Sequence, residues 1–150
     1  MALQFAAQTY RENHTESLAD PSLFTCRRTN LSDESGREGD FFEMDPSALL
    51  CRLAEGRLRG ENPRYLAALF HDTMALLIAE GVSEASQAAG GIKKAALSGG
   101  VMVNDYLAAL ISDRLTERGF EVYTHHLIPP GDNGLALGQA AAALALIRQR

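Results

Sequence analysis

The sequence has no tryptophan, only two cysteines and no excess of basic residues, and each shortage excludes a class of protein. Cys26 and Cys51 match no metal-binding spacing, and such sparse cysteine favours a reduced, cytoplasmic compartment. The net charge of −5 argues against a nucleic-acid-binding surface. Because no run of about 18 apolar residues is present, no transmembrane helix is predicted. The N-terminal residues also lack the basic and apolar regions of a signal peptide.

What remains is the composition of an ordinary globular protein. The 150 residues are 46% hydrophobic, which suits one compact domain with a core of normal size. Apolar residues at helical spacing predict three helices in the first half, with Asp45 capping the second and Gly81 ending the third. These helices are expected over residues 1–13, 46–59 and 63–80.

The stretch from residue 14 to residue 40 differs from its surroundings. It is polar and rich in turn-forming residues, so we expect a mobile loop there, most clearly over 30–40. Short strands are expected at 23–26 and 41–44. The first half of the chain is therefore predicted to consist mainly of helices around one long loop.

The second half alternates regularly between strand and helix signals. Strands are predicted at 94–97 and 120–125, and helices at 103–118 and 134–148. This order predicts parallel strands joined by a right-handed crossover. The fold class expected for the chain is therefore α/β, with a helix-rich first half and a β-α-β-α second half.

Two glycine-rich turns follow the predicted strands, at 98–101 and 129–133. Ligands of open α/β sheets bind beyond the carboxyl ends of the strands, where both turns lie. Gly99 and Gly100 remove side chains where a ligand comes close, and the following helix offers N–H groups to a phosphate. Asp132 in the second turn has the chemistry to hold a hard cation beside a nucleotide.

A structural interpretation of both turns remains open at this point. A Gly-Gly pair after a strand is more often structural than functional, and a lone Asp before a helix is most often its N-cap. The first turn also lacks the pattern of a P-loop. Composition and spacing alone therefore predict only a generic phosphate-binding edge.

Longer runs are much more specific. The runs AALSGGVMVNDYL and RGFEVYTHHLIPPGDNGLALGQA resemble the C-terminal part of the HypF family, the carbamoyltransferases of nickel–iron hydrogenase maturation. Upstream, NPRYLAALFHDTMA and MALQFAA are similar to helices of the same family. The resemblance implies the second lobe of an actin-like, sugar-kinase-like ATPase fold, related to the transferase that makes threonylcarbamoyladenosine in tRNA.

The resemblance also implies a reaction. In this family an upstream domain consumes carbamoyl phosphate and ATP to make carbamoyl-adenylate. The actin-like domain then passes the carbamoyl group to the C-terminal cysteine of a partner, HypE, for cyanide-ligand synthesis. Carbamoyl-adenylate, ATP and HypE are therefore the expected ligands and partner, with no nucleic acid and no membrane involved.

Site residues follow from the same resemblance. Gly99 and Gly100 match the turn that approaches the adenylate, and Asn104 matches an asparagine that contacts the nucleotide. Asp132 matches an aspartate that completes a divalent-metal site, and Gly134 belongs to the same nucleotide-binding motif, which reads Asp-Asn-Gly here. No catalytic residue is assignable.

The departures from the family pattern limit what the chain is expected to do. The HHxAH-type motif that supplies two metal-binding histidines is absent, and His125-His126 is better interpreted as a surface pair at a strand end. The other domains of the family are absent too. We therefore expect a C-terminal fragment with an incomplete metal site and no activity of its own. The alternatives are a binding or assembly module that self-associates, or another actin-fold phosphotransferase.

Two further residues have competing interpretations. His71 is either a histidine packed within its helix, which is the favoured interpretation, or a residue near the cleft. Ser98 is interpreted as a turn residue, because no His–Asp arrangement near it in the sequence supports a nucleophile.

Overall fold

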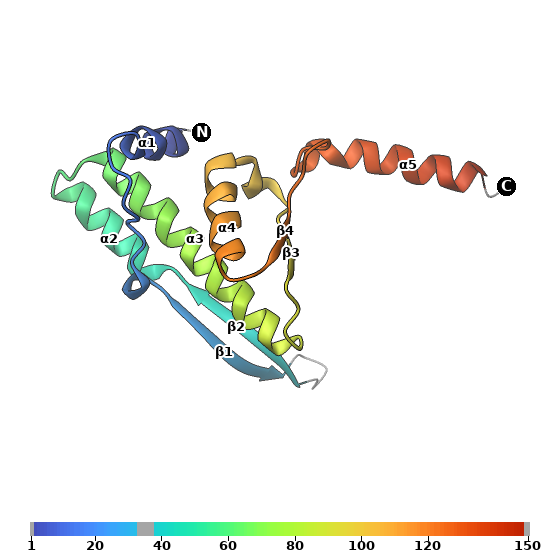
Figure 1. The fold of residues 1–150 in the computed structure, drawn as a ribbon, viewed down its shortest axis with the longest axis horizontal. Coiled ribbons are helices and arrows are strands. Elements are labelled where there is room, and N and C mark those ends of the chain that lie inside the picture. The colour runs from blue at the N-terminus through green and yellow to red at the C-terminus, as the bar shows by residue number, and fades with distance from the viewer. Residues whose placement is uncertain (1, 33–37, 149–150) are drawn as a thin grey trace.

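The computed structural model describes residues 2–32 and 38–148, and it confirms the α/β fold class. Helices and strands follow one another along an elongated molecule that ends in a projecting helix (Figure 1). In chain order the elements are α1 (Ala2–Arg11), a 3-10 turn (Pro21–Leu23), β1 (Thr25–Ser32), β2 (Glu38–Asp45), α2 (Ser47–Leu58), α3 (Pro63–Ala88), β3 (Lys94–Ala96), a 3-10 turn (Gly100–Val103), α4 (Asp105–Glu117), β4 (Glu121–Tyr123), a 3-10 turn (Asp132–Gly134) and α5 (Leu135–Arg148).

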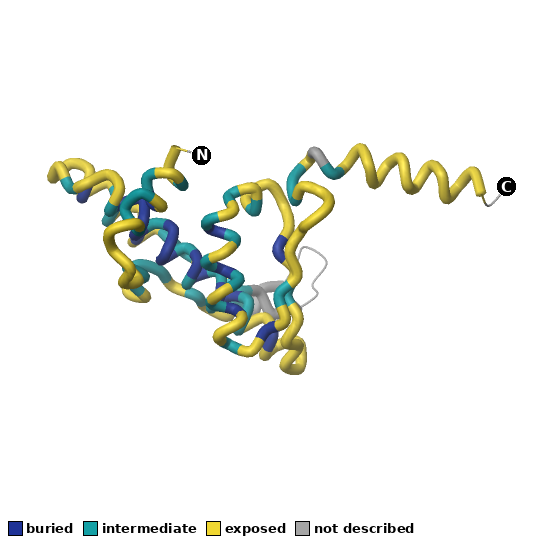
Figure 2. The backbone as a smooth tube through the Cα atoms, turned by 45° about the horizontal axis from the view of Figure 1, so that its top comes forward, coloured by how far each residue is buried: buried dark blue, intermediate teal, exposed yellow. Residues whose placement is uncertain are grey.

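The long helix α3 is the centre of the fold. Asn62 caps it by accepting a hydrogen bond from the N–H of Arg64 at 2.9 Å, and Pro63 occupies its first turn. Its buried residues form the dark band through the middle of Figure 2. By length and composition α3 could cross a membrane, but 61% of its most apolar window is buried inside the protein. It is therefore the core helix of the domain.

The predicted end of this helix at Gly81 is wrong, because α3 continues to Ala88. Gly81 is buried within the helix, and a methyl group added at its Cα would collide with the sulfur of Met44 from β2. The glycine therefore makes room for a neighbouring side chain instead of ending the helix. In the sequence alone, a glycine that ends a helix cannot be told from a glycine that packs against a neighbour inside a helix.

The loop predicted over 14–40 is also wrong in part, because strands occupy much of it. β1 and β2 form an antiparallel hairpin in which Thr25 pairs with Asp45 and Ser32 pairs with Glu38. The strand predicted at 41–44 is confirmed within β2, whereas the one predicted at 23–26 begins later and runs further. Residues 33–37, in the middle of the expected mobile loop, lie outside the described residues.

The boundaries of α2 depend on the hairpin as well. Asp45 ends β2, and its carboxylate accepts a hydrogen bond from the N–H of Ser47 at 2.9 Å. The predicted N-cap at Asp45 is wrong by one residue, because Pro46 is the N-cap and α2 starts at Ser47, although the Asp45 carboxylate still binds the first N–H of the helix. Asp45 serves both the end of the strand and the start of the helix.

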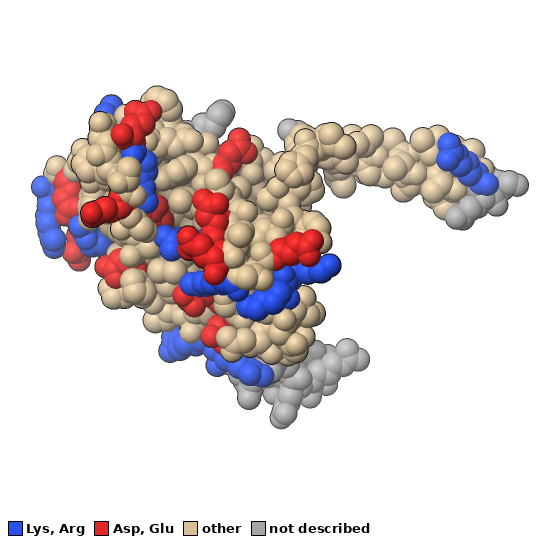
Figure 3. Space-filling model, viewed as in Figure 1, with Lys and Arg blue, Asp and Glu red and all other residues tan. Residues whose placement is uncertain are grey.

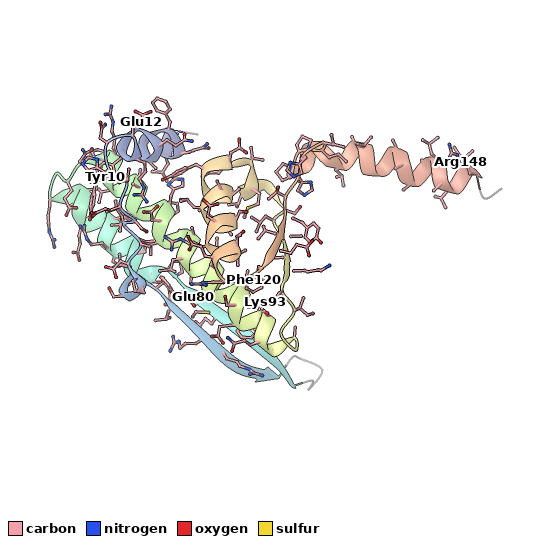
Figure 4. All side chains as sticks on the ribbon, in the orientation of Figure 1. Tyr10, Glu12, Glu80, Lys93, Phe120 and Arg148 are labelled. Atoms are coloured by element: carbon pink, nitrogen blue, oxygen red, sulfur yellow. The ribbon has the colours of Figure 1, made fainter. Side chains whose placement is uncertain are left out.

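The second half follows the predicted order. β3 and β4 pair in parallel, with Ala95 opposite Val122, and α4 forms the crossover between them. At the amino ends of the strands, the ammonium group of Lys93 lies 4.2 Å from the ring centroid of Phe120 (Figure 4). A core joins α3, α4 and this small sheet. Its buried members are Ala75, Ala79, Leu97, Leu107, Ile111, Leu115 and Phe120.

The last helix, α5, extends away from the rest of the molecule (Figure 1). Every described residue of α5 is exposed, as the continuous yellow helix in Figure 2 shows. Charge appears only near its end, at Arg148, whereas acidic and basic groups cover the body (Figure 3). A helix that is apolar on all sides is normally buried. The described residues provide no cover for α5.

Candidate functional site

The two glycine-rich turns meet at the carboxyl ends of β3 and β4. The N–H of Gly99 donates a hydrogen bond to the carbonyl of Pro130 at 2.9 Å. A methyl group at Gly131 would lie 3.6 Å from the Cα of Gly100, so the two backbones are in close contact. The expectation that both turns lie on one edge of the sheet is therefore correct.

Gly99 and Gly100 have different structural roles in the first turn. Gly99 has a φ of +97°, a conformation that disfavours any other residue. Gly100 has no positive φ, and a methyl group there would meet nothing within 4 Å. Among the described residues no acceptor binds the backbone N–H groups of Gly100 and Val101. The backbone therefore requires a glycine at 99, whereas the space beside Gly100 is open to a ligand.

This open side of the first turn borders a hollow of about 360 Å³. Its walls come from two distant parts of the chain, α1 and the 3-10 turn that precedes α4. The lining residues are Gln4, Gly100, Val101, Val103 and Asn104. The hollow is thus the place where a ligand can reach both the exposed N–H groups and the amide of Asn104.

The side chain of Asn104 is half-buried and already makes two hydrogen bonds. Its Oδ1 accepts from the N–H of Leu107 at 3.1 Å, which caps α4. Its Nδ2 lies 3.0 Å from Nε2 of His71 on α3. Asn104 therefore joins the first turn to the core helix, a role that the sequence did not reveal.

His71 is fully buried, and both of its ring nitrogens have partners. Nδ1 lies 2.8 Å from the carbonyl oxygen of Ala67, which can only accept, so Nδ1 carries the proton. Nε2 is then an acceptor for the amide of Asn104. Burial lowers the pKa of His71 despite opposing effects of the Ala67 carbonyl and the Asp72 charge, so the neutral ring is favoured. The histidine is packed within its helix, as favoured, and it also contacts a predicted site residue.

Asp132 and Gly134 occupy the second turn. Asp132 is exposed, and its carboxylate has no hydrogen-bond or ion-pair partner among the described residues. A methyl group at Gly134 would lie 3.0 Å from the carbonyl oxygen of Pro129 and 2.7 Å from Ile128. Tight packing of the turn is therefore sufficient to explain the glycine at 134.

A complete cation site is not formed by the part of the chain that the structure describes. Over residues 2–32 and 38–148 no three His, Cys, Asp or Glu side chains lie close enough to hold a metal ion. His126 lies 3.4 Å from the hydroxyl of Thr124 instead. Asp132 can therefore contribute one ligand at most, and the remaining ligands would have to come from elsewhere.

One contact at this edge was not predicted. Nε2 of His125 lies 2.9 Å from Oγ of Ser98, which links the residues that follow β4 and β3. Both side chains are exposed, and His125 lines a second hollow of about 370 Å³ together with Thr124, Asp105 and Asp113 among others. Sequence reasoning missed the pair because 27 residues separate its members. Only the parallel pairing of the strands brings them together.

Comparison with protein families identifies the region to which the chain corresponds. Residues 8–139 match the family model described as carbamoyltransferase, Kae1-like domain, second subdomain. This match includes both turns, α3 and α4.

Individual relatives agree with this match. The chain is 39% identical over 105 residues to the carbamoyltransferase HypF of Rhizobium leguminosarum bv. viciae, covering 69% of this chain and 13% of the relative. It is 35% identical over 102 residues to HypF of Rhodobacter capsulatus, covering 68% and 13%. The chain therefore spans only a small part of the length of these relatives.

A solved structure is similar as well. A crystal structure of full-length HypF in the phosphate- and nucleotide-bound form superimposes with a TM-score of 0.62 at 29% identity. The match covers 87% of this chain and 16% of that protein. Similarity therefore extends from sequence to three-dimensional fold.

Proposed function

The chain belongs to the HypF carbamoyltransferase family, in the second subdomain of its Kae1-like domain, and on this basis we propose that it forms one half of a carbamoyl-transfer site. The observation that carries the proposal is the open first turn. Gly100 leaves space for a ligand, and the N–H groups of Gly100 and Val101 are available to it. The proposed ligand is the adenylate part of carbamoyl-adenylate, which is made from ATP.

The nucleotide is proposed to enter the hollow between α1 and the first turn. Backbone N–H groups bind phosphate oxygens well because they are fixed donors. Asn104 lines the same hollow and is the proposed side-chain contact. The similar full-length HypF binds phosphate and nucleotide, which supports this choice of ligand. Gly134 is proposed to shape the opposite turn, which carries Asp132.

The proposed acceptor is the C-terminal cysteine thiol of HypE. In the transfer, the sulfur forms a bond to the carbamoyl carbon, and the bond from that carbon to the adenylate phosphate oxygen breaks. AMP leaves, and the thiol proton is released. The product is the thiocarboxamide that serves cyanide-ligand synthesis in hydrogenase maturation. A reducing cytoplasmic compartment suits thiol chemistry and the two free cysteines of this chain.

The metal is proposed to be shared with residues outside this chain. Asp132 offers one carboxylate, which fits a divalent cation only as part of a larger ligand set. A half-site of this kind is expected to bind nucleotide weakly and to transfer nothing by itself.

Substitution of Gly100 tests the nucleotide half-site. Gly100→Ala adds one methyl group beside the free N–H groups without straining the fold, so ATP binding measured by calorimetry should fall at least about tenfold, the loss expected for one charge-assisted hydrogen bond. Gly138→Ala is the matched control, because it adds the same group in open space on α5. Equal affinity of both variants and the wild type, or no binding at all, would remove the half-site.

Gly100→Ala is a cleaner test of binding than truncation of Asn104. Asn104→Ala also removes the cap of α4, so it changes stability and binding together. The same preparations can be given carbamoyl-adenylate and a peptide with the HypE C-terminal cysteine. Thiocarboxamide formed by the isolated chain would contradict the proposal that it is only half of a site.

A second candidate role is assembly, favoured by the exposed α5. Leu135, Leu144, Leu146 and Ile147 are each more than half exposed, and the helix has no charge before Arg148. An apolar surface of this kind marks a contact with another protein or with a second copy of the chain. Light scattering over a range of concentrations tests self-association. A monomer at the highest concentration would exclude it.

A further inference from the structure

His71 stands behind the proposed nucleotide hollow and does not line it. Four groups form a continuous chain of hydrogen bonds from α3 to α4. The carbonyl of Ala67 accepts from Nδ1 of His71 at 2.8 Å, and Nε2 of His71 accepts from Nδ2 of Asn104 at 3.0 Å. Oδ1 of Asn104 then accepts from the N–H of Leu107 at 3.1 Å. The carbonyl of Ala67 can only accept and the N–H of Leu107 can only donate, so the two ends fix the direction of the whole chain.

This direction fixes how Asn104 is oriented. A carboxamide has two N–H donors and one oxygen, and rotation by 180° exchanges them. In the rotated form the Asn104 oxygen would face the lone pair of Nε2, and its NH2 group would face the N–H of Leu107. Both contacts would be repulsive. With neutral His71 in place, the oxygen faces the helix and one N–H remains unused.

We propose that His71 is a positioning residue, which holds the Asn104 carboxamide so that its second N–H donates to an acceptor atom of a nucleotide in the neighbouring hollow. This inference rests on the proposed function, because it concerns the same half-site. It adds a residue that touches no ligand, and it assigns the direction of the Asn104 contact. Asn104 lines the hollow of about 360 Å³ together with Gly100. The second N–H of Asn104 and the backbone N–H groups of the first turn can therefore bind the same ligand.

The surroundings of the imidazole favour this arrangement. Tyr106 of α4 lies 5.3 Å away between ring centroids, and Phe70 lies 5.4 Å away. The charged neighbours are Asp72, the next residue of α3, and Arg11 of α1, which pairs with Asp72 at 2.7 Å. Burial of the ring outweighs the Asp72 charge, so the neutral imidazole is favoured. Protonation of Nε2 would remove the acceptor and leave Nδ2 of Asn104 without this hydrogen bond.

Nuclear magnetic resonance of the whole chain tests the hydrogen bonds without any ligand. Long-range spectra of the imidazole should show a proton on Nδ1 of His71 and none on Nε2 at neutral pH. The side-chain NH2 signals of Asn104 should move as acid protonates His71, and this titration should vanish in His71→Gln. A purely structural histidine without the Asn104 contact would leave those signals unchanged.

Binding of ATP tests the consequence for the site. His71→Leu removes the acceptor, so it should weaken ATP binding about tenfold, to the level of Asn104→Ser, which keeps an oxygen that can cap α4 but has no NH2 group. The double variant should lose no more. His71→Gln retains an acceptor and should recover part of the affinity. Ile111→Val is the control, since it disturbs the core between α3 and α4 without touching Asn104.

The outcomes separate this inference from the function on which it rests. Additive losses in the double variant, or wild-type affinity in His71→Leu, would overturn the positioning role even if ATP binds. If the wild type binds no ATP, the proposed half-site fails. In that case the spectra still test the hydrogen bond between His71 and Asn104. Asn104 side-chain signals that are the same in His71→Leu as in the wild type would show that this hydrogen bond is absent.

Discussion

Asp72 is a charged residue in the interior of the protein. Its side chain is fully buried, and Oδ2 accepts hydrogen bonds from Arg11 and from the N–H of Leu18, each at 2.7 Å. These two contacts attach α1 and the segment after it to α3. Burying an ion pair costs solvation free energy, which the attraction between the two charges offsets. Removing one partner therefore destabilises the fold strongly, because the other charge stays buried without compensation.

We therefore predict that Arg11→Leu destabilises the chain by about 3 kcal/mol, because it leaves the Asp72 carboxylate buried without its counter-ion. The measurement is chemical denaturation followed by circular dichroism. Arg59→Ala is the control, since it breaks an exposed pair with Glu55 and should cost less than about 0.5 kcal/mol. Similar costs for the two variants would contradict the buried pair.

The lowered pKa of His71 makes the stability of the fold depend on pH. Burial lowers its pKa below the 6.5 of an ordinary histidine, so the unfolded chain takes up a proton at a higher pH than the folded chain. Stability from this group is complete above pH 6.5 and declines as the pH falls below it. Urea denaturation across this range should show the decline in the wild type and a flatter profile in His71→Gln.

A second, more acidic window belongs to other groups and serves as an internal control. The pKa values of Asp20 and Asp45 are lowered by hydrogen bonds from Ser22 and Ser47. Stability from these carboxylates is present above their ordinary pKa of 3.8 and is lost as the pH falls further. His71→Gln should leave this lower part of the profile unchanged.

At the scale of elements, the contact between α3 and β2 explains why one prediction failed. Gly81 lies within α3, against the thioether of Met44. In an open helix, alanine would be favoured over glycine by about 1 kcal/mol. At this position the added methyl group would instead displace Met44, which belongs to the hairpin.

A double-mutant cycle measures this coupling. Gly81→Ala alone should raise the melting temperature little or not at all, because displacing the Met44 side chain offsets the gain in helix propensity. In a Met44→Ala background the same change should raise it, because the obstacle is gone. Circular dichroism melting curves of the four proteins are sufficient. An equal rise in both backgrounds would show that Met44 is not the obstacle.

The hairpin shows the same limit of sequence patterns. The polar, turn-rich stretch from 14 to 40 predicts a loop, yet β1 runs from Thr25 to Ser32 and pairs along its whole length with β2. A strand that is held by hydrogen bonds to its neighbour in a hairpin needs little apolar periodicity of its own. Strands with apolar residues and a parallel neighbour, such as β3 and β4, are easier to recognise.

For the whole molecule, α5 is the feature that does not fit an isolated domain. Its main contacts are with the turn Asp132–Gly134, and no other described element covers it. Figure 4 shows Arg148 at its far end, well away from the other labelled side chains. The body should therefore fold without it.

We predict that a chain ending at Gly134 keeps the melting temperature of the body within a few degrees, because the core of α3 and α4 contains no residue of α5. The same chain should bind less of a dye that reports exposed apolar surface. Leu144→Lys combined with Leu146→Lys is the matched full-length control. A large drop in melting temperature on truncation would show that α5 packs on the body in solution.

The sequence by itself determined the alternation of strands and helices after residue 94 and the position of both turns at strand ends. These features depend on local periodicity and on glycine, so they can be read from short windows. The family resemblance was also present in the sequence, and it located Gly99, Gly100, Asn104 and Asp132 as site candidates. The structure places the two turns against each other, as expected.

Only the tertiary structure decided how these residues are used. Gly99 serves the backbone and Gly100 leaves space, although the two look alike in sequence. The contact of His71 with Asn104 crosses 33 residues, and that of Arg11 with Asp72 crosses 61. Such pairs depend on where whole elements pack, which is set by the burial of α3 among its neighbours. No local pattern along the chain contains that information.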